Sequence, residues 1–242
     1  MLDTDTVLAV WGFMHGHPRV TMYDPFAGVG KGVDYFNDRG WDAWGTELEP
    51  EWAKQSVNVT CADSLAYMKL PGLWLGGIYA PFPVDCVFTS PTYANRMADH
   101  HNAADRCKAC IGRTMYEGCD PCRKCDGTGL SKRNTYRHKL GRPLSEGSSA
   151  GMQWGDEYRT FHTQAWAGVY GVLKPGGYFL LNVKDHIRKG DRCGVALWHH
   201  EMCLALGFKS VSSVPVPVRG NGFGQNGQTR VDHEWLFLYR KL

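Results

Sequence analysis

Strand-like apolar runs alternate with helix-like segments along most of this sequence, and that alternation limits the fold more than any other feature. Strands separated by helices predict an α/β fold, with a mainly parallel sheet and helices on both of its faces. The last two strands have no helix between them, so we expect an antiparallel hairpin at one edge of the sheet. The expected strands span residues 19–26, 41–47, 57–61, 84–89, 178–183, 208–218 and 234–239, and the expected helices span residues 6–15, 50–57, 157–173 and 195–206, with a further short helix that ends at Gly40.

The periodic pattern stops after residue 89 and resumes at about residue 157. Residues 94–142 hold eleven Lys or Arg against five Asp or Glu, whereas the rest of the chain holds sixteen against nineteen. This contrast predicts a main α/β domain of residues 1–93 and 157–242, interrupted by a basic insertion of residues 94–156 that faces a polyanion. A solvated loop of basic composition is the alternative.

The first expected strand ends in the glycine-rich run Asp24-Pro25-Phe26-Ala27-Gly28-Val29-Gly30. Ligands of an open parallel sheet bind beyond the carboxyl ends of its strands, and glycines there let the backbone approach a ligand closely. Dinucleotide-binding turns and purely structural turns share such a run. Glu47 lies nineteen residues beyond Gly28 and ends the second strand, where an acidic side chain can accept hydrogen bonds from both hydroxyls of a ribose. Asp63 follows the third strand, where its carboxylate can accept a hydrogen bond from the adenine amino group. Alternatively Asp63 is the N-cap of the next helix, a role for which Ser64 is also a candidate.

The tetrapeptide Ser90-Pro91-Thr92-Tyr93 directly follows the fourth expected strand. With this tetrapeptide and the glycine run, the chain resembles the S-adenosylmethionine (SAM)-dependent amino-methyltransferases of DNA. Their first motif is similar to Asp-Pro-Phe-x-Gly-x-Gly, and in their catalytic tetrapeptide Asp, Asn or Ser precedes Pro-Pro and an aromatic residue. Dinucleotide enzymes lack the Asp-Pro-Phe lead, so the resemblance favours SAM over NAD. Thr92 departs from the family pattern at the second proline, which bears on the rigidity of the loop.

The resemblance implies a Rossmann-like class I methyltransferase that transfers a methyl group to an exocyclic amino group of a flipped DNA base. Such an amine is a poor nucleophile because its lone pair is delocalised into the ring. By resemblance, the Ser90 hydroxyl and the Pro91 carbonyl accept the amine hydrogens, and Tyr93 stacks on the base. In this family, a Ser at the first position of the tetrapeptide tends to accompany methylation of cytosine N4, and an Asp tends to accompany methylation of adenine N6. Because this is a tendency and not a rule, both targets stay open for this chain. The candidate cofactor-binding residues are Asp24, Pro25, Phe26, Gly28, Gly30, Glu47, Asp63 and Ser64.

Five cysteines lie inside the insertion, in a stretch of nineteen residues. Cys107-x-x-Cys110 and Cys122-x-x-Cys125 place four thiolates for a tetrahedral zinc ion, whose role would be structural because four sulfurs leave no open position. Cys119 offers an alternative fourth ligand. Residues 122–129 also resemble the zinc repeat of DnaJ-type cochaperones, which implies the local metal-binding turn and not chaperone function. The other cysteines, Cys61, Cys86, Cys193 and Cys203, are expected to be buried small apolar residues.

Basic side chains around the cysteines are suited to phosphate contacts, and some of them to reading base edges. Beyond the fifth strand, Lys184, Arg188 and Lys189 are expected near the DNA backbone, and Asp185 and His186 in a satisfied hydrogen-bond network. The glycine-rich loop of residues 219–230 is either a cover over the substrate or a hairpin tip. The candidate nucleic-acid contacts are Arg96, Arg123, Lys124, Lys132, Arg133 and Arg137.

Double-stranded DNA is therefore the expected partner, with single-stranded DNA or RNA as alternatives. An RNA base methyltransferase and a catalytically inactive zinc- and nucleic-acid-binding protein are the competing functions. The chain opens with acidic residues where a secretory signal is basic, and it has no apolar run near the roughly eighteen residues that cross a bilayer, so we expect no membrane partner and a cytoplasmic location.

Overall fold

A computed structural model describes residues 20–70, 74–75, 78–79, 82–92, 140, 142–188, 190–218 and 231–242. The chain divides into two compact units, Met1–Tyr93 with Trp154–Leu242, and Ala94–Gln153. Of the second unit the structure describes residues 140 and 142–153, which include a short 3-10 helix, Ser149–Gly151. The helix expected at residues 6–15 and the loop at residues 219–230 lie outside the described residues.

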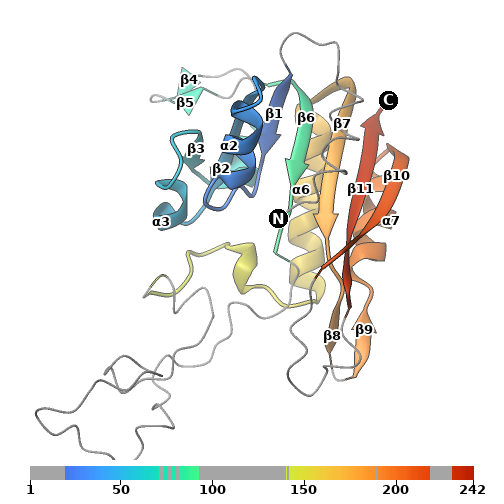
Figure 1. The fold of residues 1–242 in the computed structure, drawn as a ribbon. Coiled ribbons are helices and arrows are strands. Elements are labelled where there is room, and N and C mark those ends of the chain that lie inside the picture. Colours follow the sequence, from blue (N-terminus) through green and yellow to red (C-terminus); the bar gives the residue numbers. More distant parts are fainter. Residues whose placement is uncertain are drawn as a thin grey trace, which may run out of the picture. The chain divides into compact units, whose positions relative to one another are not determined.

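The first unit is built on a seven-stranded sheet with the order β10-β11-β7-β6-β1-β2-β3 (Figure 1). Strands β3, β2, β1, β6 and β7 pair in parallel, whereas β11 is antiparallel to both β7 and β10. The expected parallel sheet with an antiparallel C-terminal hairpin is confirmed. The strands span Thr21–Asp24 (β1), Asp42–Glu47 (β2), Val59–Cys61 (β3), Val84–Thr89 (β6), Leu173–Val183 (β7), Phe208–Pro217 (β10) and His233–Lys241 (β11).

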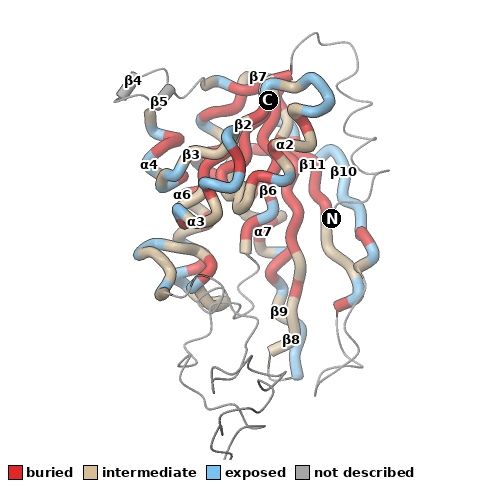
Figure 2. Tube along the Cα trace, turned by 60° about the vertical axis from the view of Figure 1, so that its left-hand side comes forward, coloured by how far each residue is buried: buried red, intermediate tan, exposed pale blue. Residues whose placement is uncertain are grey.

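Helices cover both faces of this sheet. Successive strand residues enter opposite cores: Met22 packs with helix α2, whereas Tyr23 packs with helices α4, α6 and α7. In Figure 2 the central strands are buried along most of their length and β10 is mostly exposed, as its edge position requires. None of the described helices is long and apolar enough to cross a membrane. The helices span Lys31–Asn37 (α2), Pro50–Ala53 (α3), Ser64–Tyr67 (α4), Asp156–Val172 (α6) and Val195–Ala205 (α7).

Several boundaries differ from the expected ones. Strand β7 begins at Leu173, so it includes residues 174–177, which separate the expected helix of residues 157–173 from the expected strand of residues 178–183. Leu173 pairs with Val84 and Tyr178 pairs with Cys86, so the residues between them, including the two glycines, form an irregularity in the register of the β6–β7 pair. The expected helix at residues 50–57 ends at Ala53. Two small hairpins, β4–β5 (Trp74–Leu75, Ile78–Tyr79) and β8–β9 (His186–Arg188, Asp191–Cys193), were not expected because their strands are too short to show a period.

The expectation that the four scattered cysteines are buried holds for two of them. Cys86 and Cys203 are buried thiols within the sheet and helix α7, and burial raises the pKa of Cys86 to about 12. Cys61 is exposed at the end of β3, and Cys193 is half-buried in β9. The prediction was wrong for these two residues because each ends a strand, where an apolar neighbourhood in sequence does not imply burial.

Gly45 gives a test of how tightly the loop after β1 packs on β2. A Cβ at Gly45 would lie 2.5 Å from the Ala27 Cβ and 2.8 Å from the Asp24 carbonyl oxygen. We expect Gly45→Ala to lower the free energy of unfolding by about 1–3 kcal/mol, because the backbone must move. The exposed α6 residue Gly171 has no atom within 4 Å of its hypothetical Cβ, so Gly171→Ala should be neutral or stabilising by up to about 1 kcal/mol. Urea denaturation of both variants measures this, and equal stability would contradict the close packing.

Candidate active site

The glycine-rich run forms the loop that joins β1 to α2. Gly28 and Gly30 have φ values of +55° and +80°, in the left-handed region that side chains rarely adopt. A Cβ at Gly30 would lie 2.4 Å from the Ser56 Cβ, so this glycine is required by packing within the protein. Gly28 differs, because no atom of the described residues lies within 4 Å of its hypothetical Cβ. The open space at Gly28 is therefore where a ligand can approach the backbone.

The end of β2 is tied to the same loop through Glu47. Its Oε2 accepts a hydrogen bond from the Gly28 amide at 3.0 Å, and its Oε1 accepts one from the Glu49 amide at 2.9 Å. Burial raises the pKa of Glu47, and these two amide donors act in the opposite direction. A carboxylate has about four lone-pair positions, so each oxygen keeps capacity for one more donor. Glu47 is thus fixed in place with two oxygens able to accept hydroxyl groups.

Asp63 and Ser64 begin helix α4 in different ways. Asp63 is exposed, and its Oδ1 accepts a hydrogen bond from the Leu65 amide at 2.8 Å, as a helix N-cap does. The N-cap alternative for Asp63 is therefore observed, and the bond engages one of its two oxygens. Ser64 is buried, and its hydroxyl contacts the Pro25 carbonyl and lies 3.0 Å from the Thr46 hydroxyl. Ser64 supports the glycine loop from beneath.

Thr46 is a supporting residue that sequence reasoning missed. It is fully buried, and its hydroxyl lies 2.7 Å from the Tyr23 hydroxyl and 3.3 Å from the Pro25 carbonyl, besides its contact with Ser64. The three hydroxyls connect β1, β2 and α4 beneath the Asp-Pro-Phe segment. A hydroxyl residue inside the expected strand of residues 41–47 was the available signal, but nothing in the sequence identified its partners.

The end of β6 lies beside the end of β1. The hydroxyl of Thr89, the last residue of β6, donates a hydrogen bond to Asp24 Oδ1 at 2.6 Å, and both side chains are buried. The chain proceeds from β1 to β2 and β3 on one side and returns to β6 on the other, so this is the point where the strand order reverses. Ligands of open α/β sheets bind at such a point. The structure therefore brings the glycine run and residues 90–92 to one place on the sheet.

Ser90 and Pro91 follow directly. Ser90 is exposed, and its Oγ accepts a hydrogen bond at 3.3 Å from the side-chain nitrogen Nδ2 of Asn182, near the end of β7. The same nitrogen donates to Glu234 Oε2 at 2.8 Å. Pro91 is buried. Tyr93 lies outside the described residues, so its predicted stacking role stays a prediction.

Helix α6 supports both motifs from one side of the sheet. Phe26 packs against three α6 side chains, Phe161, His162 and Trp166, with ring centroids 5.9–6.0 Å apart. One turn earlier on the same helix, the Tyr158 hydroxyl donates a hydrogen bond to the Thr92 carbonyl at 2.9 Å. The first half of α6 is therefore a shared support of the glycine loop and of the segment after β6.

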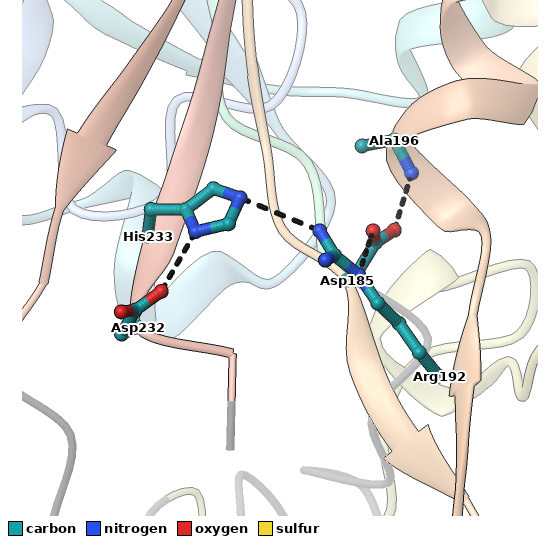
Figure 3. Close-up of polar contacts among 5 residues, drawn as sticks. All are labelled: Asp185, Arg192, Ala196, Asp232 and His233. Carbon is teal, nitrogen blue, oxygen red and sulfur yellow. Dashed lines mark hydrogen bonds and ion pairs between the residues drawn. The ribbon is translucent and has the colours of Figure 1, made fainter. Parts of the chain in front are cut away.

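Beyond the end of β7 lies the β8–β9 hairpin, which Figure 3 shows in part. The buried carboxylate of Asp185 accepts hydrogen bonds from the Ala196 amide at 2.7 Å and from Arg192 Nε at 2.8 Å. Arg192 in turn lies 3.3 Å from the ring of His233, which contacts Asp232. The expected hydrogen-bond network at Asp185 is confirmed, and it fixes the hairpin to α7 and β11.

The expected zinc ligands Cys107, Cys110, Cys122 and Cys125, and Cys119, lie outside the described residues. So do Lys189 and the candidate nucleic-acid contacts Arg96, Arg123, Lys124, Lys132, Arg133 and Arg137. Within the part of the chain that the structure describes, no group of three His, Cys, Asp or Glu residues is arranged to hold a metal ion. Lys184 and Arg188 are half-buried, and Arg188 donates to the Trp154 carbonyl at 3.1 Å.

Asp24 gives the site a pH dependence that can be measured. Burial raises the pKa of Asp24 from 3.8 to about 7, although the hydrogen bonds from Thr89 and the Phe26 amide act in the opposite direction. Between about pH 4 and pH 7 the folded chain holds a proton that the unfolded chain has lost. The contribution of Asp24 to stability is therefore full below about pH 4 and is lost as the pH rises to about 7.

Asp24→Asn keeps an Oδ1 acceptor and does not titrate, so it isolates this effect. We expect the variant to gain stability relative to the wild type between pH 5 and 7.5, by about 2–3 kcal/mol. Urea denaturation at several pH values measures the difference. Asp42→Asn, at an exposed carboxylate of β2, is the control and should parallel the wild type. A constant difference between Asp24→Asn and the wild type over this range would contradict the buried proton.

Comparison with solved structures shows the fold. A SAM-dependent methyltransferase from Archaeoglobus fulgidus is 11% identical with a TM-score of 0.51, over 98% of this chain and 92% of that chain. The Burkholderia thailandensis 1,6-didemethyltoxoflavin-N1-methyltransferase is 15% identical with a TM-score of 0.45, over 96% of this chain and 75% of that chain. TTHA0409 of Thermus thermophilus, named as a candidate DNA modification methylase and solved with S-adenosyl-L-methionine, is 20% identical with a TM-score of 0.29.

The match to TTHA0409 covers 35% of this chain and 37% of that chain, so the chain spans little more than a third of its length. No protein-family model matches the sequence, and no curated protein matches it. The near full-length similarity to the Archaeoglobus protein shows that this chain has the Rossmann-like fold of SAM-dependent methyltransferases.

Proposed function

We propose that this protein is a SAM-dependent methyltransferase that modifies an exocyclic amino group of a base in DNA. The observation that carries the proposal is the buried hydrogen bond between Thr89 and Asp24, 2.6 Å long. It joins the carboxyl ends of β6 and β1, so the tetrapeptide that begins at Ser90 starts beside the glycine-rich loop. A methyl donor and its acceptor must meet within bonding distance, and this arrangement supplies one position for each.

The residues around the glycine loop fit the adenosine and methionine parts of SAM. Glu47 has two fixed oxygens that can accept the ribose hydroxyls, and the open space at Gly28 admits a ligand against the backbone. Asp63 has one oxygen engaged in capping α4, and the other is suited to an adenine amino group. SAM, when bound there, supplies an electrophilic methyl group on a sulfonium.

The residues at the end of β6 fit the amine. The exposed Ser90 hydroxyl and the Pro91 carbonyl are hydrogen-bond acceptors at adjacent positions, as an amine with two hydrogens requires. When both hydrogens are held, the nitrogen can use its lone pair to form the new N–C bond as the S–C bond breaks. The extra proton then leaves the nitrogen to solvent. Tyr93 is proposed to stack on the flipped base.

DNA is favoured over RNA by the resemblance of both motifs to the DNA amino-methyltransferases. Lys184 and Arg188 follow the end of β7, where a nucleic-acid backbone bound over the site would pass. The basic residues of the insertion are proposed to add further phosphate and base contacts. Methylation of structured RNA alone would move the proposal to an RNA base methyltransferase.

The test is incubation with labelled SAM and either mixed duplex DNA or structured RNA, followed by mass spectrometry of the nucleosides. We expect N4-methylcytosine or N6-methyladenine from DNA. Tyr93→Ala should lose this activity while keeping the affinity for SAM, because its proposed contact is with the base. Glu47→Gln should weaken SAM binding about tenfold or more by titration calorimetry, since hydrogen bonds to a charged acceptor contribute about 1.5–3 kcal/mol each.

Glu51→Gln, on helix α3, is the matched control for the Glu47 variant and should bind SAM as the wild type does. A wild-type protein that does not bind SAM would overturn the proposal and favour a zinc- and nucleic-acid-binding protein without activity. Unchanged turnover of Tyr93→Ala would rule out its stacking role.

We further propose a structural zinc ion on Cys107, Cys110, Cys122 and Cys125, with Cys119 as the alternative ligand. The support is the spacing of the two Cys-x-x-Cys pairs in a segment whose polar sequence has no apolar core of its own. Because zinc binds thiolates and holds the segment folded, its removal should expose the insertion to protease.

Elemental analysis of protein purified without chelator should give one zinc per chain. Cys110→Ser and Cys122→Ser should lose the metal, whereas Cys61→Ser, at an exposed thiol of β3, should keep it. Cys119→Ser and Cys125→Ser decide between the alternative ligands. A metal-free wild-type protein would contradict the zinc site.

A further inference from the structure

A chain of hydrogen bonds starts on helix α6, passes through helix α7, returns to α6 and ends at the segment after β6. Trp166 Nε1 donates to His199 Nδ1 at 2.8 Å, His199 Nε2 lies 3.0 Å from the Tyr158 hydroxyl, and that hydroxyl donates to the Thr92 carbonyl at 2.9 Å. The Tyr158, Trp166 and His199 side chains are all fully buried. None of these three residues has a part in the proposed function so far.

Chemistry fixes the direction of every bond in this chain. An indole nitrogen can only donate, so His199 Nδ1 must be the acceptor and carries no proton. Burial lowers the pKa of His199 well below its ordinary value, so the ring is neutral and its single proton is on Nε2. Nε2 therefore donates to the Tyr158 oxygen. The Tyr158 hydroxyl proton is then directed at the remaining acceptor, the Thr92 carbonyl.

The neighbouring side chains leave this arrangement little freedom. The His162 ring packs on Tyr158 in a tilted arrangement with ring centroids 3.9 Å apart, and its Nδ1 donates to the Tyr158 backbone carbonyl at 2.9 Å. The Trp154 ring also packs on Tyr158, with ring centroids 5.6 Å apart. The hydroxyl is therefore held by packing as well as by its hydrogen bonds.

The acceptor at the end of the chain is in the tetrapeptide itself. A carbonyl held by a buried donor restricts the ψ angle of its residue, and so the direction in which the chain continues. Thr92 stands where the amino-methyltransferase pattern has a second proline, and proline restricts a backbone through its φ angle. A hydrogen bond from Tyr158 restrains the same residue through its other backbone dihedral.

We infer that Tyr158, oriented by His199 and Trp166, is a positioning residue that holds the Ser90–Thr92 segment in its transfer-competent conformation in place of the second proline. The inference rests on the proposed methyl transfer. Tyr158 does not touch the substrate or the methyl group. It acts by keeping the Pro91 carbonyl and the Ser90 hydroxyl at the separation that the two amine hydrogens require, and a misplacement of about 1 Å at such a site costs roughly a hundredfold in rate.

Tyr158→Phe removes the hydroxyl alone and is the test. We expect its kcat to fall about tenfold or more, with the affinity for SAM unchanged within about twofold, because the glycine loop is untouched. Tyr170→Phe is the matched control. Tyr170 lies further along the same helix, packs on Phe208 and is remote from the tetrapeptide, so its kcat should equal that of the wild type. Thermal denaturation of both variants shows that each is folded.

Trp166→Phe tests the chain at its far end. Without the indole donor, His199 can place its proton on Nδ1 and compete with Thr92 for the Tyr158 hydroxyl. Trp166→Phe should therefore lower kcat, and Trp166→Phe combined with Tyr158→Phe should lower it no further than Tyr158→Phe alone. Independent losses of packing would instead multiply.

The outcomes separate the two proposals. A wild-type protein that binds SAM and methylates no nucleic acid overturns the proposed function. A wild-type protein that transfers methyl groups, with Tyr158→Phe within twofold of its kcat or with an equal fall in Tyr170→Phe, overturns the positioning role alone. Multiplicative losses in the double variant overturn the relay from Trp166.

Discussion

The meeting of β1 and β6 at Asp24 and Thr89 is the contact on which the rest of the site depends. The pair is buried, so its hydrogen bond is made without competition from water, and its loss would leave the buried Asp24 carboxyl group with the Phe26 amide as its remaining described donor. Through this contact the glycine-rich run that starts at Asp24 and the segment that starts at Ser90 begin at neighbouring points, although their starts are more than sixty residues apart in the sequence. Glu47 joins the same loop from β2, so three adjacent strand ends define one position on the sheet.

Helix α6 adds a second constraint from one face of the sheet. Its early residues pack on Phe26 and hold the Thr92 carbonyl, so the helix supports the donor side and the acceptor side of the proposed reaction together. A rigid element shared by two loops keeps their separation constant better than either loop alone can. Burial among the aromatic rings around Tyr158 lowers the pKa values of His162 and His199, which explains why these two histidines stay neutral.

Much of the fold was predictable from the sequence, because apolar periodicity and glycine punctuation are local signals. The mainly parallel sheet, the helices on its two faces and the antiparallel C-terminal hairpin all follow from such signals. The start of β7 could not be predicted from local signals, because pairing with β6 keeps Leu173 in the sheet despite the glycines that follow it. The contacts of Thr46, Asn182 and Tyr158 were beyond reach, because each joins residues that only the tertiary fold brings together.

The bond between Thr92 and Tyr158 has a consequence for the sixty residues between Tyr93 and Trp154. That stretch leaves the main unit and rejoins it at points that are already fastened to each other. The entropy lost on closing a loop grows only slowly with its length once the ends are held. Segments of very different size and sequence can therefore be exchanged there at little cost to the stability of the sheet.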